Sequence, residues 1–418
     1  MFVLTAKEKL LKEITDYYLT SLDYNGLPVY AIENCDIELL CQLIEENHIE
    51  VLSSDDVLNP HIKAFDSHLD ASTQKELLIS NFDHCVLYPS SQTLSTIDID
   101  YSVPYTAQMR KGTKQFDIVY FDIEILERYA NNPIFFLADS GYRGMICPED
   151  KYCEYDGIDY EYIRDYGMAY IDGEKLRRAI GVFVCDLAKL SPKKQQLWKG
   201  FELEHQDKCH VHSGFIKNLI LGEWVTDVWF FHAILDEMVV INKICNAISI
   251  PPLFNHTYGT HYTEKPEGYR NILLPTKKNY HDFVVVLEKL LVHNLSYKTF
   301  VQEGIMVKSV SRKDEAGTDK GSMQMLKEWL CINTSADEEK IQKYIITPLK
   351  TIRKIRQTPA HELTTNEYDI DYYKKQFDLI NDAYGSIRSI RELLYSHPYA
   401  KTVILPDYFT DGTPIVNY

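Results

Sequence analysis

The stretch from Lys343 to His361 constrains the fold of this chain more than any other, because its apolar residues recur at the spacing of an α-helix. Residues three or four positions apart lie on one face of a helix, and such an apolar face is buried against other elements. The stretch therefore predicts a helix that packs against the rest of the protein along one side. The recurring positions are Ile345, Leu349, Ile352 and Ile355.

A second face of the same predicted helix is cationic. Lys350, Arg353 and Arg356 stand three positions apart, and Lys354 lies beside them. No Asp or Glu occurs between residues 341 and 360, although the 418-residue chain carries a formal net charge of -17. That overall charge argues against binding of nucleic acid over a broad surface. Any contact with RNA is therefore expected to be local, on a small patch such as this face.

Pro359 predicts where the helix ends. A proline disfavours helical geometry at the residue before it, so the helix is expected to end near Arg356 and the chain to bend before His361. The two side chains can then face one cleft. Cleavage of RNA by its 2′-hydroxyl needs a group that moves protons near neutral pH and a fixed cation for the charged transition state. Histidine and arginine supply both functions without a metal.

Residues 356–361, with the sequence RQTPAH, resemble the arginine, polar residue, short gap and histidine of the motif in HEPN-superfamily ribonucleases. The resemblance extends over roughly residues 282–400. It implies an all-α helical bundle, a homodimer or higher oligomer in which two motifs face each other, and a metal-independent endoribonuclease without a cofactor. It also implies a bacterial toxin or antiphage effector that acts on RNA, under an inhibitory or activating protein partner.

Two sets of candidate site residues follow, and no metal ligand is among them. Arg356 and His361 are the candidate catalytic pair, and Gln357 is the polar residue of the motif. The candidate RNA-binding residues are Lys350, Arg353 and Lys354.

Two other interpretations stay open. A non-catalytic helical bundle for assembly or nucleic-acid binding would use Arg356 as a structural ion-pairing group and His361 as a helix cap. A metal-dependent nuclease would instead use the acidic, tyrosine-rich stretch 149–174, because clustered carboxylates can bind Mg²⁺. The spacing of these carboxylates fits no recognisable cage. We therefore expect the stretch to be an exposed acidic surface, or a docking surface for a basic partner.

Soft metal ligands gather in one further place. Zinc could bind several of these side chains, but Cys209 and His210 are adjacent in the sequence, and no second pair of cysteines lies nearby. The nine cysteines are scattered and odd in number, which argues against a disulfide framework. No signal-peptide core or membrane-length apolar run is present, so a cytoplasmic protein is expected. The gathered ligands are His205, Cys209, His210 and His212.

The pattern of elements predicts an α+β chain. Residues 1–250 are expected to form a mixed α/β sensor or regulatory region, and the Pro- and Gly-containing residues 251–280 a linker. Residues 281–400 are expected to form the HEPN-like helical domain, followed by a tail at 401–418. A long helical pattern over 215–246, broken near Gly222, places Trp224 on an inward stripe and His232 beside it as a buried structural histidine.

Overall fold

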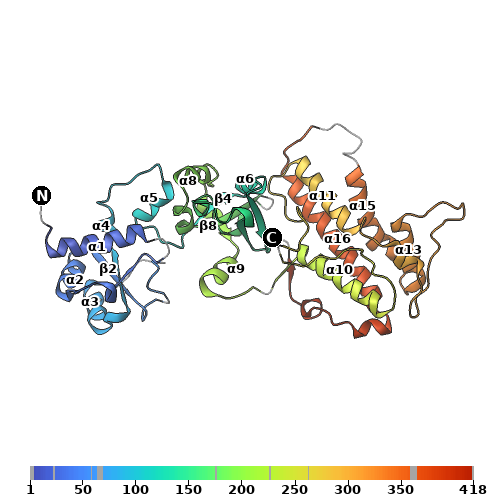
Figure 1. Ribbon diagram of the computed structural model, residues 1–418, viewed down its shortest axis with the longest axis horizontal. Helices are drawn as coiled ribbons and strands as arrows, with labels where there is room; N and C mark the ends of the chain where they lie inside the picture. The colour runs from blue at the N-terminus through green and yellow to red at the C-terminus, as the bar shows by residue number, and fades with distance from the viewer. Residues whose placement is uncertain are drawn as a thin grey trace.

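Figure 1 shows the computed structural model, an elongated molecule with the N-terminal elements at one end and a bundle of helices at the other. The structure describes residues 4–21, 24–57, 59–63, 69–174, 177–225, 227–261, 263–357 and 365–416. A six-stranded sheet lies between the two ends. The predicted α+β fold class, a mixed N-terminal part followed by a helical C-terminal part, is confirmed.

The N-terminal module packs helices against a small antiparallel sheet in the order β1-β3-β2. Its core is apolar, and Ile14, Leu43 and Leu87 are fully buried in it. The elements are α1 (Ala6–Thr20), β1 (Leu27–Pro28), η1 (Val29–Ala31), α2 (Ile37–Glu45), β2 (Ile49–Ser53), α3 (Ala71–Ser80), η2 (Phe82–His84), β3 (Cys85–Pro89) and α4 (Ser91–Leu94). Helix α5 (Pro104–Arg110) follows and packs against elements of the central sheet region.

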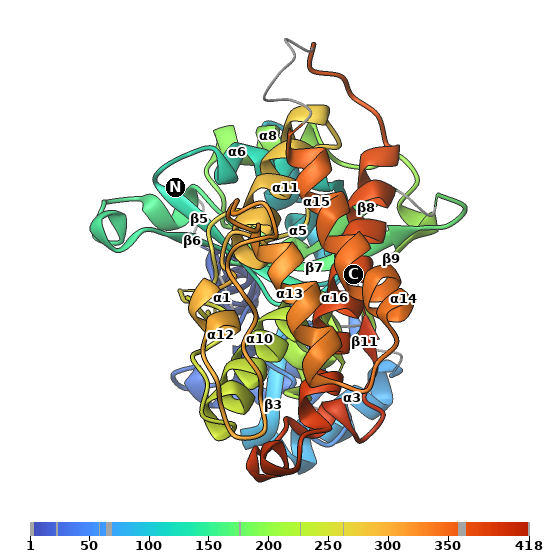
Figure 2. The same ribbon diagram turned by 90° about the vertical axis from the view of Figure 1, so that its right-hand side faces the viewer.

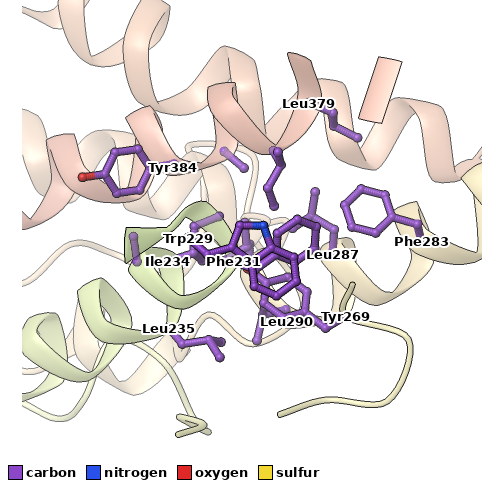
Figure 3. Close-up of a cluster of buried hydrophobic side chains, with 14 of the residues drawn as sticks. Trp229, Phe231, Ile234, Leu235, Tyr269, Phe283, Leu287, Leu290, Leu379 and Tyr384 are labelled. Carbon is purple, nitrogen blue, oxygen red and sulfur yellow. The ribbon is translucent and has the colours of Figure 1, made fainter. Parts of the chain in front are cut away.

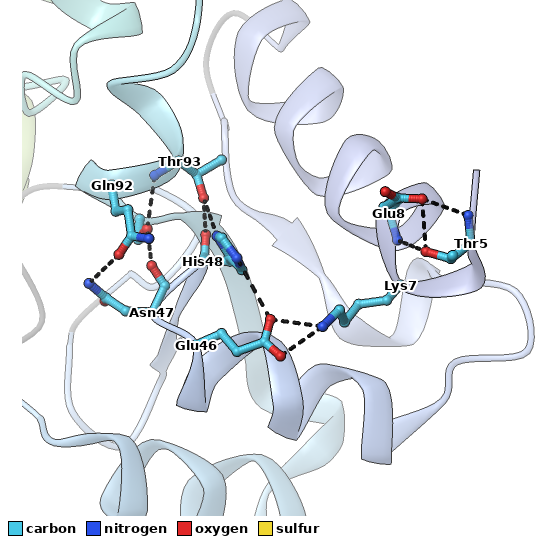
Figure 4. Close-up of polar contacts among 9 residues, drawn as sticks. Thr5, Lys7, Glu8, Glu46, Asn47, His48, Gln92 and Thr93 are labelled. Carbon is cyan, nitrogen blue, oxygen red and sulfur yellow. Dashed lines mark hydrogen bonds and ion pairs between the residues drawn. The ribbon is translucent and has the colours of Figure 1, made fainter. Parts of the chain in front are cut away.

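Polar contacts fix the helix ends of this module, as Figure 4 shows. Thr5 and Glu8 form a capping box at the start of α1, in which the Thr5 amide donates to Glu8 Oε2 over 2.7 Å. Lys7 donates to both carboxylate oxygens of Glu46, at 2.7 and 2.8 Å, and so joins α1 to the end of α2. The Thr93 hydroxyl donates to the carbonyl of His48 over 2.8 Å. These contacts cap α1, join it to the end of α2, and join Thr93 of α4 to the residue before β2.

The central sheet is antiparallel, with the strand order β4-β8-β7-β6-β5, and β9 pairs with β7 beside this path. Trp198 is fully buried under the sheet and donates from Nε1 to the hydroxyl of Tyr129 over 2.9 Å. The elements are β4 (Ile118–Asp122), η3 (Ile123–Leu126), α6 (Glu127–Ala130), β5 (Phe135–Asp139), β6 (Arg143–Pro148), β7 (Asp165–Ile171), β8 (Arg178–Phe183), α7 (Val184–Ala188), α8 (Pro192–Lys199), η6 (Gln206–Lys208) and β9 (Cys209–Val211).

The helical body is built around the long helix α16, which packs against α10 and against α15. Figure 3 shows the buried cluster in which side chains of α10, α11 and α16 meet, with Phe231 and Leu287 near its centre. Between the sheet and this body lie α9 (Ser213–Ile216) and η7 (Lys217–Leu221), which pack on the sheet. The elements of the body are β10 (Val228–Trp229), α10 (Phe230–Ala247), α11 (Lys277–Leu291), α12 (Tyr297–Val301), α13 (Ser322–Asn333), α14 (Glu338–Ile341), η8 (Gln342–Ile346), α15 (Thr347–Gln357), α16 (Asp371–Tyr395), η10 (Pro398–Thr402), η11 (Asp407–Phe409) and β11 (Ile415–Val416).

The expected boundary at residues 251–280 does not separate two packed bodies. Helix α10 precedes it and yet packs against α16, to which it is joined by a buried ion pair between Glu237 and Arg391. Much of the segment itself is fastened to α16, because the Tyr373 hydroxyl donates to the carbonyl of Leu273 over 2.7 Å and Gln376 to that of Arg270 over 2.9 Å. The prolines and glycines mark turns inside the helical body and not a free linker.

The expected tail, 401–418, is also packed in its described part. Strand β11 pairs in parallel with β10, and the Tyr408 hydroxyl donates to Asp236 of α10 over 2.8 Å. The described chain therefore returns to the junction between the sheet and the helices, where Figure 1 marks the C-terminus.

The long helical pattern over 215–246 gives more than one element. Gly222 adopts a left-handed backbone with φ of 67°, which ends η7 and turns the chain before β10 and α10. Trp224 lies in this connection with 77% of its surface exposed, so its predicted inward position was wrong. The stripe within α10 is buried as predicted, including Ile234, Met238 and Ile241. Among the described residues, no helix has both the length and the apolar character that crossing a bilayer requires.

Candidate functional site

The helix that carries the candidate motif runs from Glu338 to Gln357 and contains a π-helical segment, η8, before α15. Pro348 explains this widening, since it has no N–H to donate and its ring crowds the carbonyl one turn earlier. The Thr347 hydroxyl donates instead to the carbonyl of Gln342 over 2.8 Å. The wider turn lets both Ile345 and Ile346 point inward.

One face of α15 is buried, as the apolar spacing predicted. Leu349 and Ile352 are fully buried against α11 and α16, and Ile355 is partly buried. The hydroxyl of Ser386 in α16 donates to the carbonyl of Ile345 over 3.0 Å, inside the core. Full burial of Leu349 and Ile352 contributes on the order of 1.5–3 kcal/mol each, so α15 is fixed to the bundle.

The opposite face of α15 is exposed and cationic. Lys350, Arg353, Lys354 and Arg356 all have exposed side chains, and Gln357 is exposed beside them. Within the described chain, Lys350, Arg353 and Arg356 form no ion pair and no hydrogen bond to a side chain. The interpretation in which Arg356 is a structural ion-pairing group therefore has no partner for it among the described residues.

The end of α15 accounts for part of this arrangement. Lys354 and Arg356 lie in the last turn, where the partial negative charge of the helix C-terminus stabilises a cation by about 0.3–1 kcal/mol. Such a contribution explains why basic residues are tolerated at this end. The helix dipole needs no contact with the guanidinium of Arg356, which has no ion-pair partner in the part of the chain that the structure describes.

The chain that follows the motif is anchored to the N-terminus of α11. The amide of Lys277 donates to the carbonyl of Glu367, and the amide of Lys278 to Asn366 Oδ1, both over 3.0 Å. Thr276 and Tyr368 form a single antiparallel bridge beside them. The candidate catalytic residue His361 lies in 358–364, outside the described residues. The described flanks of the motif on both sides are thus held on the bundle.

The acidic stretch 149–174 is exposed over much of its first half, whereas its second half enters the sheet as β7, where Tyr166 is fully buried. Asp156 and Asp159 are exposed, and Asp165 pairs with Arg143 at 2.6 Å. Over the described ranges, no group of three His, Cys, Asp or Glu side chains converges as a metal site would require. The predicted exposure holds for Asp156 and Asp159, and the part of the stretch that forms β7 is instead packed in the sheet.

The side chains of Cys209, His210 and His212, which were considered as zinc ligands together with His205, contact different groups. The Cys209 thiol donates to the carbonyl of His205 over 3.4 Å, and His210 Nε2 lies 3.0 Å from Asp172. His212 Nδ1 accepts from the amide of Gly214 over 3.1 Å and so caps α9. The side chains of Cys209, His210 and His212 thus have different partners, and the described residues hold no shared metal centre here.

A buried polar cluster, which sequence reasoning missed, lies where the sheet meets the helices. The Lys265 ammonium donates to the carbonyl of Asp139, lies 3.4 Å from His232 Nε2, and sits 5.4 Å over the ring of Trp229. The Tyr166 hydroxyl donates to Asp139 Oδ1 over 2.7 Å. These residues come from β5, β7, β10, α10 and the segment before α11, so no local pattern in the sequence could reveal the cluster.

Burial changes the protonation of this cluster. It lowers the pKa of His232 to about 4, with a further contribution from the nearby charge of Lys265, so His232 is neutral at pH 7. Burial also lowers the pKa of Lys265, and the carboxylate of Asp139 opposes that effect. The prediction of a buried structural histidine at 232 fits these contacts.

Comparison with protein-family models, curated proteins and solved structures found no match to this chain. The geometry of its own residues therefore carries the functional argument.

Proposed function

We propose that the helical body is a HEPN-type ribonuclease domain that binds single-stranded RNA on the cationic face of α15 and cleaves it without a metal. The observation that carries the proposal is that Arg353 and Arg356 are exposed and form no ion pair with any described residue, on a helix fixed into the bundle. A protein with a net charge of -17 that holds Lys350, Arg353 and Arg356 without an acidic partner among its described residues is expected to use them for an anion.

The proposed reaction assigns one role to each residue of the motif. His361 takes the proton of the 2′-hydroxyl, whose oxygen attacks the adjacent phosphorus, and the bond to the 5′-oxygen breaks. The Arg356 guanidinium binds two non-bridging oxygens and stabilises their increasing negative charge. The departing 5′-oxygen takes a proton from a histidinium or from water, which leaves a 2′,3′-cyclic phosphate. Gln357 donates a neutral hydrogen bond to the same phosphate.

Electrostatics limit how RNA binds to this face. Lys350, Arg353 and Arg356 can each neutralise one phosphate, and binding to single strands then weakens with salt with a logarithmic slope of about -2 per protomer. A homodimer with two facing motifs would double that slope to about -4. The proposed oligomer therefore changes the affinity for RNA as well as the geometry of the site.

The experiment that tests the proposal compares binding and cleavage in one set of variants. Full-length protein is incubated with labelled single-stranded RNA and with DNA of the same sequence, with and without EDTA. Arg356→Ala and Arg356→Lys should both lose cleavage, since an ammonium cannot bind two phosphate oxygens at once. Arg164→Ala is the matched control, because the Arg164 side chain is 79% exposed and far from α15 in sequence. Cleavage of DNA, or its loss on adding EDTA, would contradict the proposal.

A second candidate, a nucleic-acid-binding bundle without catalysis, rests on the same exposed cations. It predicts that the wild type binds RNA and leaves it intact, and that Arg353→Ala weakens this binding. A metal-dependent nuclease that uses the acidic stretch predicts that Asp156→Asn with Asp159→Asn abolishes cleavage. Cleavage by the proposed HEPN-type domain should be unaffected by the same two changes.

A further inference from the structure

The two outer strands of the central sheet, β4 and β5, differ in how their edges are covered. The outer edge of β4 is closed by residues 201–203, because Asp122 donates from its amide to the carbonyl of Phe201 over 2.9 Å and Leu203 to that of Tyr120 over 3.0 Å. Strand β5 pairs with β6 on one side, and no described strand pairs with its other side. Figure 2 shows β5 and β6 at the margin of the sheet away from β9.

The register of β5 shows which backbone groups face outward. Glu149 donates from its amide to the carbonyl of Ile134 over 2.8 Å, and Ser140 to that of Arg143 over 2.9 Å. In an antiparallel pair the backbone N–H and C=O groups of successive residues alternate in direction, so the N–H and C=O of Leu137 point away from β6. The same alternation turns the carbonyl of Phe135 and the amide of Asp139 outward. An open row of donors and acceptors at strand spacing results.

A groove of about 950 Å³ runs beside this open edge. One wall is formed by residues 130–139 and the other by residues 263–270, with Glu149 and Lys151 at one end. Lys265 reaches across the groove at the other end, where its ammonium donates to the outward-facing carbonyl of Asp139. The groove therefore combines main-chain hydrogen-bonding groups with a second wall that can contact side chains.

Charge within the groove is uneven along its length. Glu149 and Glu267 are exposed and solvated, whereas Lys265 and Arg270 are partly buried near Asp139. The guanidinium of Arg270 makes no hydrogen bond or ion pair with any described residue, and Asp139 already receives the Tyr166 hydroxyl. A partly buried guanidinium without a partner favours an incoming carboxylate.

We propose that this groove binds an extended, acidic peptide segment of a partner protein by strand addition to β5. The peptide backbone pairs with Leu137 and its neighbours, and a peptide Asp or Glu pairs with Arg270. Main-chain hydrogen bonds supply affinity in this mode, and side-chain pockets along the walls supply specificity. The inference is independent of ribonuclease activity and gives the α/β part of the chain a place for a regulatory partner.

A peptide fits the groove better than a second copy of this chain. Pairing of β5 with β5 of another copy would bring together two grooves that hold the same charged side chains, so it offers Arg270 no carboxylate beyond those that line its own groove. A segment with a carboxylate opposite Arg270 supplies the partner that this guanidinium lacks among the described residues. The occupant is therefore expected to be acidic and extended, with alternate side chains facing the sheet and the second wall.

The test begins with a phage-displayed library of random seven-residue peptides selected on the full-length protein. An enriched peptide is then synthesised with a fluorescent label, and its affinity is measured by fluorescence polarisation. Peptides that contain Asp or Glu within an alternating apolar pattern should be enriched. Arg270→Gln should weaken binding roughly tenfold, the loss expected for a charge-assisted hydrogen bond.

Leu137→Pro is the decisive variant, because it removes an outward N–H while leaving the β5–β6 hydrogen bonds in place. It should weaken binding roughly fivefold or more, and Leu137→Ala, which keeps the N–H, should bind like the wild type if the main chain is what the peptide contacts. Peptides methylated at alternate backbone nitrogens provide the same test without altering the protein. One set of positions should abolish binding and the other should not.

Three results would overturn the proposal. The first is no enrichment on the wild type over Leu137→Pro. The second is equal binding of all methylated peptides, which would indicate contacts through side chains only. The third is a wild-type dimer in light scattering that Leu137→Pro converts to monomer, which would assign the groove to a second copy of the chain.

Discussion

Removing Arg391 tests whether α10 belongs to the helical body. Its guanidinium donates to both carboxylate oxygens of Glu237, at 2.8 and 3.1 Å, and both side chains are almost fully buried. Arg391→Met keeps most of the side-chain volume and leaves a buried carboxylate without a partner. Breaking such a pair costs about 3–5 kcal/mol, much of which is the penalty of the remaining charge. At about 1–2 °C per kcal/mol for a chain of 418 residues, the melting temperature should fall by roughly 3–10 °C at pH 7.

The pH dependence of this variant has a definite sign. Burial raises the pKa of Glu237, and Arg391 lowers it, so loss of Arg391 raises that pKa further. A carboxyl whose pKa is higher in the folded state binds more protons there, so stability rises as the pH falls through that value. Arg391→Met should therefore recover part of its lost stability between pH 7 and pH 5. The wild type keeps its ion pair and should gain less.

Thermal melts of the wild type, Arg391→Met and the double variant Glu237→Gln with Arg391→Met give the measurement. The double variant carries no buried charge and should melt closer to the wild type than the single variant does. A single variant that melts within about 2 °C of the wild type at pH 7 would refute the reasoning, since even 3 kcal/mol corresponds to more. A recovery that is absent at pH 5 would contradict the assignment of the penalty to Glu237.

Three further predictions follow from α15 and the buried cluster. Ile352→Ala should lower the free energy of unfolding by about 2–5 kcal/mol in urea melts, because Ile352 is fully buried; a loss below about 1 kcal/mol would mean that α15 is not packed as described. Lys350→Ala and Arg353→Ala should each reduce the logarithmic salt slope of RNA binding by about 0.7, measured by fluorescence polarisation from low to moderate salt, and an unchanged slope would remove that residue from the interface. Lys265→Met should raise the pKa of His232 from about 4 towards the ordinary range in an NMR titration, although burial will still hold it low; an unchanged pKa would show that Lys265 has no influence there.

The sequence predicted α15 well because everything that defines it is local. Its apolar period gave the buried positions Leu349 and Ile352, and the absence of acidic residues gave the cationic face. The predicted inward position of Trp224 was wrong because the helical period of the apolar residues continues across Gly222 in the sequence, whereas the left-handed backbone of Gly222 ends the helix. A periodic pattern does not record where the chain turns.

The domain boundary and the buried cluster depended on contacts between distant residues. The side chains of Tyr373 and Gln376 in α16 form hydrogen bonds with the backbone of residues 270–273. Nothing in the sequence around these two residues indicates that contact. Lys265 and Asp139 meet across more than a hundred positions in the chain. Turn residues alone therefore predicted a linker, and only the packing shows that these turns lie within the helical body.

The measurement that tests the central proposal most directly is the single-turnover rate of RNA cleavage by full-length wild type and His361→Ala in the presence of EDTA. The proposed chemistry predicts cleavage by the wild type with 2′,3′-cyclic phosphate products, and a rate about a hundredfold to ten-thousandfold lower for His361→Ala at unchanged RNA affinity. Cleavage by His361→Ala at the wild-type rate would contradict the proposal, as would binding of RNA by the wild type with no cleavage at all.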